Sequence, residues 1–404
     1  MEKLKGPLDG VKVVSCSTAQ AGTVPYMLMA DLGAEVVKIE VPGVGDQSRY
    51  QGMIPDHPSS YFETNNRGVK SLTLNLKDSE AQEILLRLVA DADVFGQNFR
   101  PGAAEKNGFG YNDLRKVNPK LVYASVSGYG PNGPNASLPG TDAMGQALGG
   151  VAEAFSTPGQ PLRTGVVSIA DETCAILTFG GILAALHSAG VTGVGQKVDT
   201  SLLGGQVRLM GWTLTNTMWR DCNPVTGQVR ISGTAERPSM SANFLDKDSN
   251  PFVFQLRGSS WESAMTALGF YKELTDLGLS DLGVVVSSEA MRKIMLDTLD
   301  IFFGKNKREH WIESLRAVDI VAAPINSLIE ASNDADVLAN GYVSEIEYPE
   351  YGKALKVHGS PWNFSKTPAQ IGVAPKLGQH TEEILIGLGY SEIEIKKYRD
   401  NGVI

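Results

Sequence analysis

The sequence has few of the residues that build metal centres and disulfide frameworks. Its 404 residues include three cysteines and five histidines. Cys16, Cys174 and Cys222 are widely spaced without a CxxC pair, and the histidines lack metal-ligand spacing. We therefore expect free thiols in a reducing compartment, a cytoplasmic location and no metal site.

Positive charge and long hydrophobic runs are also scarce. Lys and Arg total 36 against 45 Asp and Glu, and the net charge of −9 argues against nucleic acid and anionic membranes as partners. The longest uncharged apolar run, Thr173–Leu186, is too short and too rich in small residues to span a membrane. The first six residues lack the apolar core of a signal peptide. A local cluster of Lys and Arg would still allow a polyanionic ligand to bind.

Three common signatures of nucleotide binding or hydrolysis are missing. The first predicted strand is followed by Ser17–Gly22, which does not match the GxGxxG fingerprint of nicotinamide enzymes. No GxSxG elbow and no GxxxxGK(S/T) loop occur. These absences argue against a nicotinamide-dependent dehydrogenase, an α/β serine hydrolase and a P-loop enzyme.

Alternating strands and helices fill the first half of the chain. The length exceeds the size at which one core normally stops growing, so we expect two domains. Strands are predicted at 11–15, 35–39, 71–76, 94–97 and 121–127, with helices at 25–32 and 78–90. The repeated βαβ pattern predicts an α/β fold with an open, parallel sheet of Rossmann type.

The second half of the chain changes character at about residue 221. Asn, Pro, Gly, Ser and Thr interrupt the periodicity over 221–250, which we interpret as a linker between a large domain at 1–220 and a small domain at 251–318. The small domain is expected to contain a strand at 252–256 and helices at 261–268, 288–303 and 307–315. The remainder, 319–404, has extended segments at 343–348 and 354–358 and a final helix near 381–388.

Two acids lie at the start of an otherwise uncharged helical pattern. Asp171 and Glu172 follow Ser168, and the chain then runs without charge to His187, which predicts a helix buried nearly all round. A carboxylate in the first turn faces the positive end of the helix dipole, so we expect it to be ionised at neutral pH. Ser168 and Asp171 also fit a variant capping box. The local sequence leaves the cap and a reactive acid as alternatives.

Four loops follow the carboxyl ends of predicted strands, where open α/β sheets bind ligands. They carry Gln20, Asn75 with Lys77, Asn98–Arg100, and Gly128–Pro134. Amides, cations and glycines suit a nucleotide with phosphates, although each of them alone also fits an ordinary turn or a surface charge.

An ordered set of motifs covers essentially the whole chain. The motifs are LDGVKVVSCSTAQAGTVPYMLMADLGAEVVKIEVPGVGD, NNRGVKSLTLNLK, NFRPGAAEKNGF, SVSGYGPNGP, GVGQKVDTSLL, VAAPINSLIEA and SKTPAQIGVAPKLGQHTEEILIGLGYS. Together they resemble the family III CoA-transferases, which include formyl-CoA:oxalate and carnitine CoA-transferases and the related α-methylacyl-CoA racemases.

The resemblance implies a fold and an assembly. Members of this family form a large Rossmann-like domain from both chain ends and a smaller α+β domain from the middle. Two subunits are threaded through each other as an interlocked homodimer. The crossing segments would be 221–250 and 317–328, and the active site would draw on both subunits.

The resemblance also implies the substrates and the residues that bind them. Coenzyme A and acyl-CoA would be substrates together with a small carboxylic acid, and no cofactor would be bound permanently. By position, CoA would contact Gln20, Ala21, Asn75, Lys77, Asn98, Phe99, Arg100 and Lys106, with Asp142 as a substrate-side or structural acid. Val41 stands where transferases commonly have Arg.

Asp171 matches the catalytic aspartate of the family. The implied mechanism is covalent: the carboxylate attacks a thioester to form a mixed anhydride, and the CoA thiolate then converts the anhydride into an aspartyl-CoA thioester. A second acid attacks this thioester, and CoA is transferred. Such chemistry requires a site that excludes water.

Two alternatives remain beside acyl transfer. The related racemases use a His as a second acid/base in a segment that corresponds to Pro139–Met144, where this chain has Thr141. Thr does not exchange a proton near neutral pH, so a transferase is favoured over a racemase. A CoA-binding protein without catalysis is the other alternative, and exchange between acyl-CoA and free acids would distinguish it.

The substrate pair is less clear from the sequence. Oxalate-using members carry a glycine-rich loop over the active site, and the corresponding stretch, Pro238–Phe244, is not glycine-rich, which argues against formyl and oxalyl substrates. Met240, Phe244 and Trp212 suggest a larger apolar acyl group, although core packing explains such residues equally well.

Overall fold

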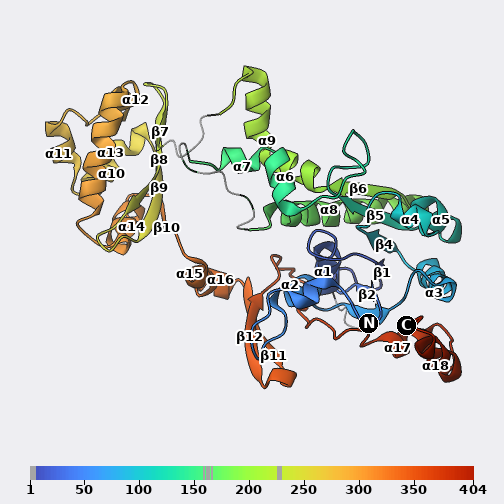
Figure 1. The fold of residues 1–404 in the computed structure, drawn as a ribbon. Coiled ribbons are helices and arrows are strands. Elements are labelled where there is room, and N and C mark those ends of the chain that lie inside the picture. The colour runs from blue at the N-terminus through green and yellow to red at the C-terminus, as the bar shows by residue number, and fades with distance from the viewer. Residues whose placement is uncertain (1–5, 158–159, 161–163, 165–166, 225–229) are drawn as a thin grey trace. The chain divides into compact units, whose positions relative to one another are not determined.

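The computed structural model describes residues 6–157, 160, 164, 167–224 and 230–404 (Figure 1). The interpretations of the first five residues and of 225–229 lie outside this range. The chain divides into two compact units, each considered by itself below. One combines Met1–Ser156, Pro161–Pro224 and Asp336–Ile404, and the other combines Thr157–Gln160 with Val225–Ala335.

A six-stranded parallel sheet forms the centre of the first unit. In spatial order its strands are β3 (Lys70–Thr73), β2 (Glu35–Glu40), β1 (Lys12–Ser15), β4 (Val94–Gln97), β5 (Val122–Ser127) and β6 (Lys197–Ser201). Val13 of β1 is in register with Val36 of β2 and with Val94 of β4. The order 3-2-1-4-5-6 is that of the Rossmann fold, so the predicted α/β class with a parallel sheet is confirmed. β6 was not predicted.

Helices and a hairpin complete the first unit. The helices are α1 (Val24–Asp31), α2 (Ser60–Asn66), α3 (Ser79–Ala90), α4 (Ala103–Lys106), α5 (Tyr111–Val117), α6 (Asp142–Leu148), α7 (Val151–Ala154), α8 (Ile169–Thr192), α9 (Leu202–Arg220), α16 (Ala335–Ala339), α17 (Thr381–Gly387) and α18 (Glu392–Asp400). β11 (Val343–Tyr348) and β12 (Lys353–His358) form an antiparallel hairpin, and 3-10 turns lie at Gln47–Tyr50 and Pro349–Tyr351. The predicted strands near 343–348 and 354–358 and the helix near 381–388 are confirmed, whereas α18 was not predicted.

Side chains of alternate strand residues pack in two apolar cores on opposite faces of the sheet. Val14 and Phe95 pack in one core with side chains of α3, α5, α17 and α18. Val13 and Val94 pack in the other core with side chains of α1 and α8. Because successive side chains of a strand point to opposite faces, a sheet covered on both faces needs apolar residues at consecutive positions.

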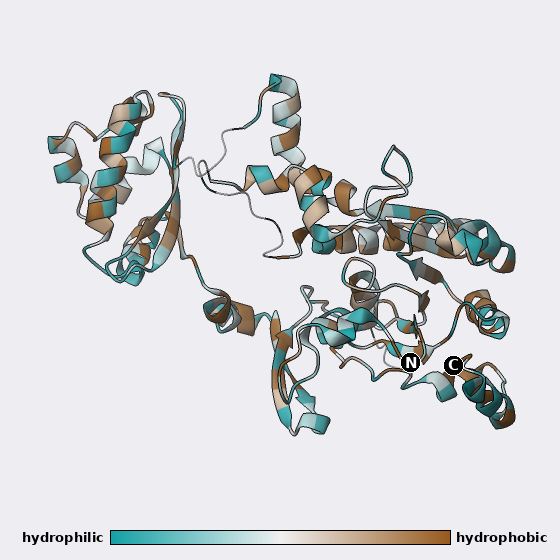
Figure 2. Cartoon of the chain, in the orientation of Figure 1, coloured by the Kyte–Doolittle hydropathy of each residue, from teal (hydrophilic) through white to brown (hydrophobic). Residues whose placement is uncertain are grey.

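The second unit is built on an antiparallel sheet. Its strands, in spatial order, are β10 (Val321–Pro324), β9 (Pro251–Arg257), β8 (Pro238–Leu245) and β7 (Ile231–Gly233). Its helices are α10 (Trp261–Ala267), α11 (Tyr271–Asp276), α12 (Leu282–Val286), α13 (Glu289–Phe303), α14 (Arg308–Arg316) and α15 (Leu328–Ser332), with a 3-10 turn at Gly258–Ser260. Rings of Phe244, Phe252, Phe254 and Phe303 lie 4.5–6.2 Å apart at the centre of its core. The helices show both brown and teal in Figure 2, as expected for helices with one face on a core.

The segment 221–250 differs from the predicted linker. Strands β7 and β8 lie within it, and β8 pairs with β9 from Ser239 to Leu245. Buried Met240, Ala242 and Phe244 alternate with exposed residues, a period of two that neighbouring turn-forming residues obscured in the sequence. Met240 and Phe244 are core residues of the second unit, so the suggestion that they contact an acyl group is wrong.

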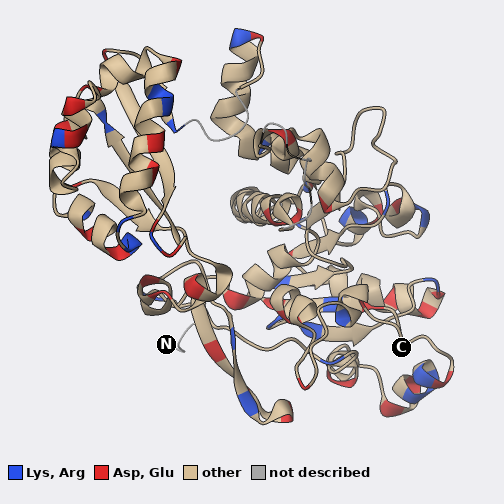
Figure 3. Cartoon of the chain, turned by 60° about the vertical axis from the view of Figure 1, so that its left-hand side comes forward, with Lys and Arg blue, Asp and Glu red and all other residues tan. Residues whose placement is uncertain are grey.

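Helix α8 is not buried nearly all round, as its composition suggested. Ile176 and Leu177 are 55% and 40% exposed, and on α9 Trp212 and Trp219 are 83% and 85% exposed. Both helices are mostly tan in Figure 3, because few of their residues are charged. Exposed apolar residues of this size provide a surface that a partner can cover.

Helix α8 is also, within the described ranges, the one helix that is long and apolar enough to cross a membrane. Length and composition alone give this result, which core helices of globular folds also satisfy. In the structure α8 packs against α1, α9, β5 and β6.

Gly96 provides a test of how tightly the sheet packs against α1. A Cβ atom at this position would lie 1.8 Å from the Tyr26 hydroxyl oxygen. We expect Gly96→Ala to lower the free energy of unfolding by about 1–3 kcal/mol, the usual cost of overpacking a core. Gly387→Ala is the control, because a Cβ there would meet no atom within 4 Å. Equal urea midpoints for the two variants would contradict the close packing.

Candidate active site

A cleft of about 560 Å³ opens at the carboxyl ends of β1, β4 and β5. Its walls come from Thr18–Ala21, Asn98–Pro101, Val126–Gly128 and Leu138–Asp142, and Asp171 of α8 also lines it. The strand order reverses between β1 and β4, which is the place where open α/β sheets bind ligands. Of the predicted site residues, the cleft contains Gln20, Ala21, Asn98, Phe99, Arg100, Asp142 and Asp171.

A second hollow of about 330 Å³ adjoins this cleft. The two share Thr18 and Phe99, and the second also contains Asn75, Lys77 and Val41. The Phe99 ring lies 5.7 Å from the ring of Phe109, so packing holds it at the junction. The two hollows thus bring together loops from the ends of five neighbouring strands, β1 to β5.

The first turn of α8 is capped by a residue from another helix. Ser168 is the N-cap residue, but its side chain makes no capping hydrogen bond, so the predicted capping box is wrong. Instead, Asp142 Oδ1 accepts hydrogen bonds from the backbone N–H groups of Ala170 at 2.8 Å and Asp171 at 3.1 Å. Gln146 holds the other Asp142 oxygen at 2.5 Å. Asp142 therefore fixes the head of α8 and places a second carboxylate beside Asp171.

The expectation that Asp171 is fully ionised at neutral pH is also wrong. Burial, followed by the neighbouring charges of Asp142 and Glu172, raises the pKa of Asp171 to about 7. The dipole of α8 favours the anion, but the first-turn donors that would reach it are already partly used by Asp142. Burial and the two neighbouring acids thus oppose the ionisation that the helix dipole favours.

Gln20 connects the loop after β1 to helix α8. Its Nε2 donates to Glu172 Oε1 at 2.5 Å, and its Oε1 accepts from the Tyr61 hydroxyl at 3.3 Å. Burial raises the pKa of Glu172, and the hydrogen bond from Gln20 lowers it in part. Gln20 is therefore fixed next to Asp171 by its neighbours on two sides.

Tyr61 is a site residue that sequence reasoning missed. It lies on α2, and its hydroxyl contacts Gln20. Burial first and the charge of Asp171 second raise its pKa to about 12, so its hydroxyl keeps its proton. No strand end or local motif precedes Tyr61, and only the packing of α2 brings its hydroxyl to Gln20.

Three predicted CoA contacts are cations that form no ion pair within the described residues. Arg100 lines the cleft and Lys77 lines the second hollow, and both are exposed. Lys106, the last residue of α4, is exposed and lies outside both hollows. Arg100 and Lys77 are thus available to the phosphates of a ligand.

Other predicted contacts hold the loops of the site. Asn98 Oδ1 accepts from Thr18 N at 3.0 Å, and Asn98 Nδ2 donates to Thr18 O at 2.8 Å. Asn75 Oδ1 accepts from the backbone N–H of Lys77 at 3.4 Å. Ala21, 7% exposed, belongs to the small apolar cluster beneath the cleft. Any contact of these residues with a ligand would come in addition to these roles.

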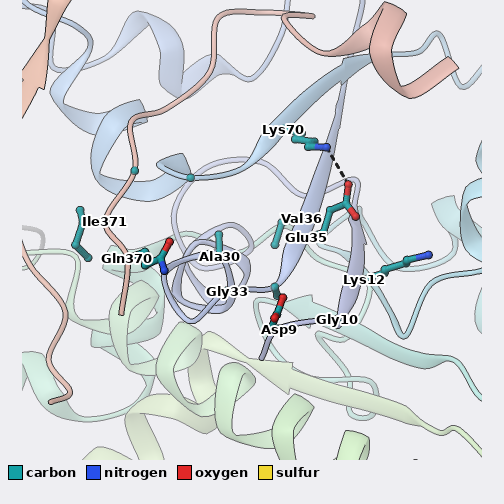
Figure 4. Close-up of a pocket in the computed structure, with 13 residues that line it drawn as sticks. Asp9, Gly10, Lys12, Ala30, Gly33, Glu35, Val36, Lys70, Gln370 and Ile371 are labelled. Carbon is teal, nitrogen blue, oxygen red and sulfur yellow. Dashed lines mark hydrogen bonds and ion pairs between the residues drawn. The ribbon is translucent and has the colours of Figure 1, made fainter. Parts of the chain in front are cut away.

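Figure 4 shows a different hollow, of about 520 Å³, at the amino ends of β1, β2 and β3. Lys12, Glu35 and Lys70 lie here at the first residues of β1, β2 and β3. Lys70 pairs with Glu35 and Glu383 at 2.9 Å, and Lys12 pairs with Asp91. Since its two lysines are neutralised by carboxylates, this hollow is a poor site for phosphates, and none of the predicted site residues lies in it.

Comparisons with known proteins identify the family of the chain. The model of CoA-transferase family III matches residues 8–381. Formyl-CoA:oxalate CoA-transferases of Shigella sonnei and Escherichia coli are 31% identical over 426 residues, covering 98% of this chain and 99% of each relative. A CaiB/BaiF family protein from Brucella suis has a TM-score of 0.83 at 27% identity, over 95% of this chain and 100% of that one. Rv3272 from Mycobacterium tuberculosis has a TM-score of 0.77 at 26% identity, also over 95% of this chain and 100% of that one.

The chain belongs to CoA-transferase family III. The family predicted from the sequence is confirmed, and the protein is an enzyme of the CoA-transferase class. The parallel six-stranded sheet matches the fold of the CaiB/BaiF structures.

The raised pKa of Asp171 predicts a stability change that depends on pH. The unfolded chain releases this proton near pH 4 and the folded chain near pH 7, so the folded state loses relative stability as pH rises between these values. Asp171→Asn has no charge to bury and should unfold at a temperature at least about 2 °C higher than the wild type at pH 8. The difference should shrink as the pH falls from 7 toward 4, where Asp171 is protonated in the folded wild type and increasingly so in the unfolded chain. A wild type that is the more stable at pH 8 would contradict the assigned environment.

Proposed function

We propose that the enzyme transfers CoA from an acyl-CoA to a small carboxylic acid through covalent intermediates on Asp171. The observation that carries this proposal is the location of the Asp171 carboxylate, in the cleft at the strand reversal and partly removed from water. A carboxylate with few water neighbours is a stronger nucleophile than a hydrated one. With a pKa of about 7, a large fraction is still the reactive anion at neutral pH.

The reaction begins when an Asp171 oxygen attacks the thioester carbonyl. The carbon–sulfur bond breaks, CoA leaves as a thiolate, and a mixed anhydride remains. The thiolate then attacks the Asp171 carbonyl carbon, which releases the first acid as a carboxylate and leaves an aspartyl-CoA thioester. The acceptor carboxylate attacks this thioester, and the displaced thiolate attacks the acceptor acyl group of the new anhydride. Acceptor-CoA leaves, and Asp171 returns to its starting state.

The proposed position of CoA follows from the two adjoining hollows. The thioester would lie beside Asp171, and the phosphates would lie near Lys77 and Arg100, which have no ion-pair partner within the described chain. Phe99 lies at the junction of the hollows and would contact the linking part of CoA. Val41, 55% exposed, offers an apolar surface where related enzymes have Arg, so this end of CoA would be held by packing rather than by charge.

Thr141 supports transfer rather than racemisation. It lines the cleft beside Asp142 and Asp171, where a racemase would need a second group that exchanges protons. A Thr hydroxyl does not do so near neutral pH. A non-catalytic CoA-binding role would not require a largely buried carboxylate in the cleft. Exchange of acyl groups between acyl-CoA and free acids distinguishes this alternative from transfer.

The proposed assembly is an interlocked homodimer located in the cytoplasm. Its support is the exposed apolar surface of α8 and α9 and the presence of both chain ends in one compact unit. One large domain, formed by 1–220 and the C-terminal part of 319–404, would then be joined to a small domain around 251–318 by crossing segments within 221–250 and 317–328, with β7 and β8 belonging to the small domain. The acidic net charge supports small molecules, rather than nucleic acid or membranes, as the other partners.

Replacement of Asp171 tests the proposed reaction. A panel of CoA esters and carboxylic acids, read by mass spectrometry, first identifies a donor and an acceptor. Asp171→Asn and Asp171→Ala should fold and bind CoA but lose at least about 10³-fold in kcat, because the nucleophile is gone. Glu172→Gln is the control for loss of a neighbouring acid and should retain measurable transfer. Transfer by Asp171→Asn at the wild-type rate would contradict the role of Asp171.

The two unpaired cations provide a separate test of CoA placement. We expect Arg100→Ala and Lys77→Ala each to raise KM for acyl-CoA about 10-fold with little change in kcat, and to weaken the dependence of KM on salt. Lys116→Ala is a matched control, because Lys116 is exposed on α5 and pairs with Asp113 at 3.6 Å. An unchanged KM in both cleft variants would contradict the proposed path of CoA.

A further inference from the structure

A buried ion pair lies beneath the loop that carries Gln20. Lys38 of β2 and Asp46 of the following loop meet at 2.8 Å, and their side chains are only 3% and 0% exposed. Charged groups are seldom buried so completely unless they make specific hydrogen bonds. Burial alone would raise the pKa of Asp46, but Lys38 and the N–H of Ser48 outweigh it and lower the pKa, so Asp46 is an anion.

Both members of this pair hydrogen-bond to the backbone of the active-site loop. Lys38 Nζ donates to the Ser17 carbonyl oxygen at 2.7 Å. Both carboxylate oxygens of Asp46 accept from the Ala19 N–H at 3.3 Å. The pair therefore holds the loop by hydrogen bonds at Ser17 and Ala19, immediately before Gln20.

The backbone conformation of Ala19 explains why the loop needs these hydrogen bonds. Its φ is +58°, in the left-handed region that a residue with a Cβ rarely adopts. Without its hydrogen bonds to the Asp46 carboxylate, Ala19 would relax toward negative φ and turn the next residue away. That residue is Gln20, whose amide contacts Glu172 beside Asp171 and accepts from Tyr61.

A second buried ion pair in the same unit provides a comparison. Asp31 and Arg67 meet at 2.6 Å, and both side chains are 1% exposed. Arg67 donates in addition to the backbone carbonyl oxygen of His358, at the end of β12. This pair is as deeply buried as Lys38–Asp46, but neither of its residues lines the cleft or the second hollow.

We infer that Lys38 and Asp46 are positioning residues of the transferase, which hold Ala19 in its left-handed conformation so that Gln20 reaches Glu172 and the reacting thioester. The inference rests on the proposed function, because it assigns to Gln20 a part in CoA transfer. The segments 38–40 and 43–46, which contain Lys38 and Asp46, thereby have a role in CoA transfer in addition to the stability of the sheet. The ion pair acts through Gln20 and does not itself touch the reacting atoms.

The test compares Asp46→Asn with Asp31→Asn, Gln20→Ala and the double variant Gln20→Ala/Asp46→Asn. Asp46→Asn places an amide N–H₂ against Lys38 or the Ala19 N–H, and it should lower kcat by about 10-fold or more, as Gln20→Ala does. The double variant should be no slower than Gln20→Ala alone, because both changes remove the same contact. Asp31→Asn should lower the melting temperature to a similar extent but keep kcat within about twofold of the wild type.

Hydrogen exchange gives a readout that does not depend on activity. Peptides that contain Ala19 should exchange faster in Asp46→Asn than in the wild type and should be unchanged in Asp31→Asn. If Asp46→Asn does not fold, Lys38→Gln serves instead, since it removes the charge and keeps a donor near Ser17. A kcat for the folded variant equal to that of Asp31→Asn, or additive losses in the double variant, would overturn the inference. Failure of the proposed function would look different, with no transfer in the wild type or full transfer in Asp171→Asn.

Discussion

The N–H groups at the start of α8 receive their hydrogen bonds from Asp142, a residue 28 and 29 positions earlier in the chain. A helix start leaves several donors without partners inside the helix, and here a carboxylate from α6 supplies what Ser168 does not. These bonds join α6 to α8, the longest of the described helices. They also place the carboxylates of Asp142 and Asp171 close together, which contributes to the raised pKa of Asp171. The stability gained by capping is thus partly offset by repulsion between two acids, as is common where a protein keeps a reactive group.

Close backbone contact makes this arrangement possible. A Cβ on Gly128 would lie 2.6 Å from the Cα of Gly140, so the two ends of the loop between β5 and α6 touch without side chains between them. The contact sets Thr141 and Asp142 at the edge of the cleft. On the other side of the cleft, Asn98 joins the loops after β1 and β4 through two hydrogen bonds to Thr18. The site therefore rests on loop-to-loop contacts at the strand reversal rather than on one rigid motif.

The sequence predicted the sheet, the ligand-binding edge and most of the site residues, because strand periodicity and strand ends are local properties. The motifs of the family added Asp171, which local reasoning left as one of two alternatives. The cap by Asp142 and the contact of Gln20 with Glu172 were not predictable, since each joins residues 28 or more positions apart through tertiary packing. The raised pKa of Asp171 was not predictable either, because the burial that mainly causes it results from the same packing. Tyr61 was not predicted as a site residue for the same reason, since it contacts Gln20 only through tertiary packing. Strand β8 was taken for linker because the turn-forming residues around it outweighed its short apolar alternation.

The exposed apolar side chains of α8 and α9 show where a single chain leaves its packing incomplete. The measurement that tests the account most directly, however, concerns Asp171. The enzyme is incubated with an acyl-CoA donor without acceptor, quenched with hydroxylamine, digested, and examined by tandem mass spectrometry. The account predicts a hydroxamate on Asp171 that forms only when acyl-CoA is present. A hydroxamate on Glu172 or Asp142, or none at all in an enzyme that turns over its substrates, would contradict it.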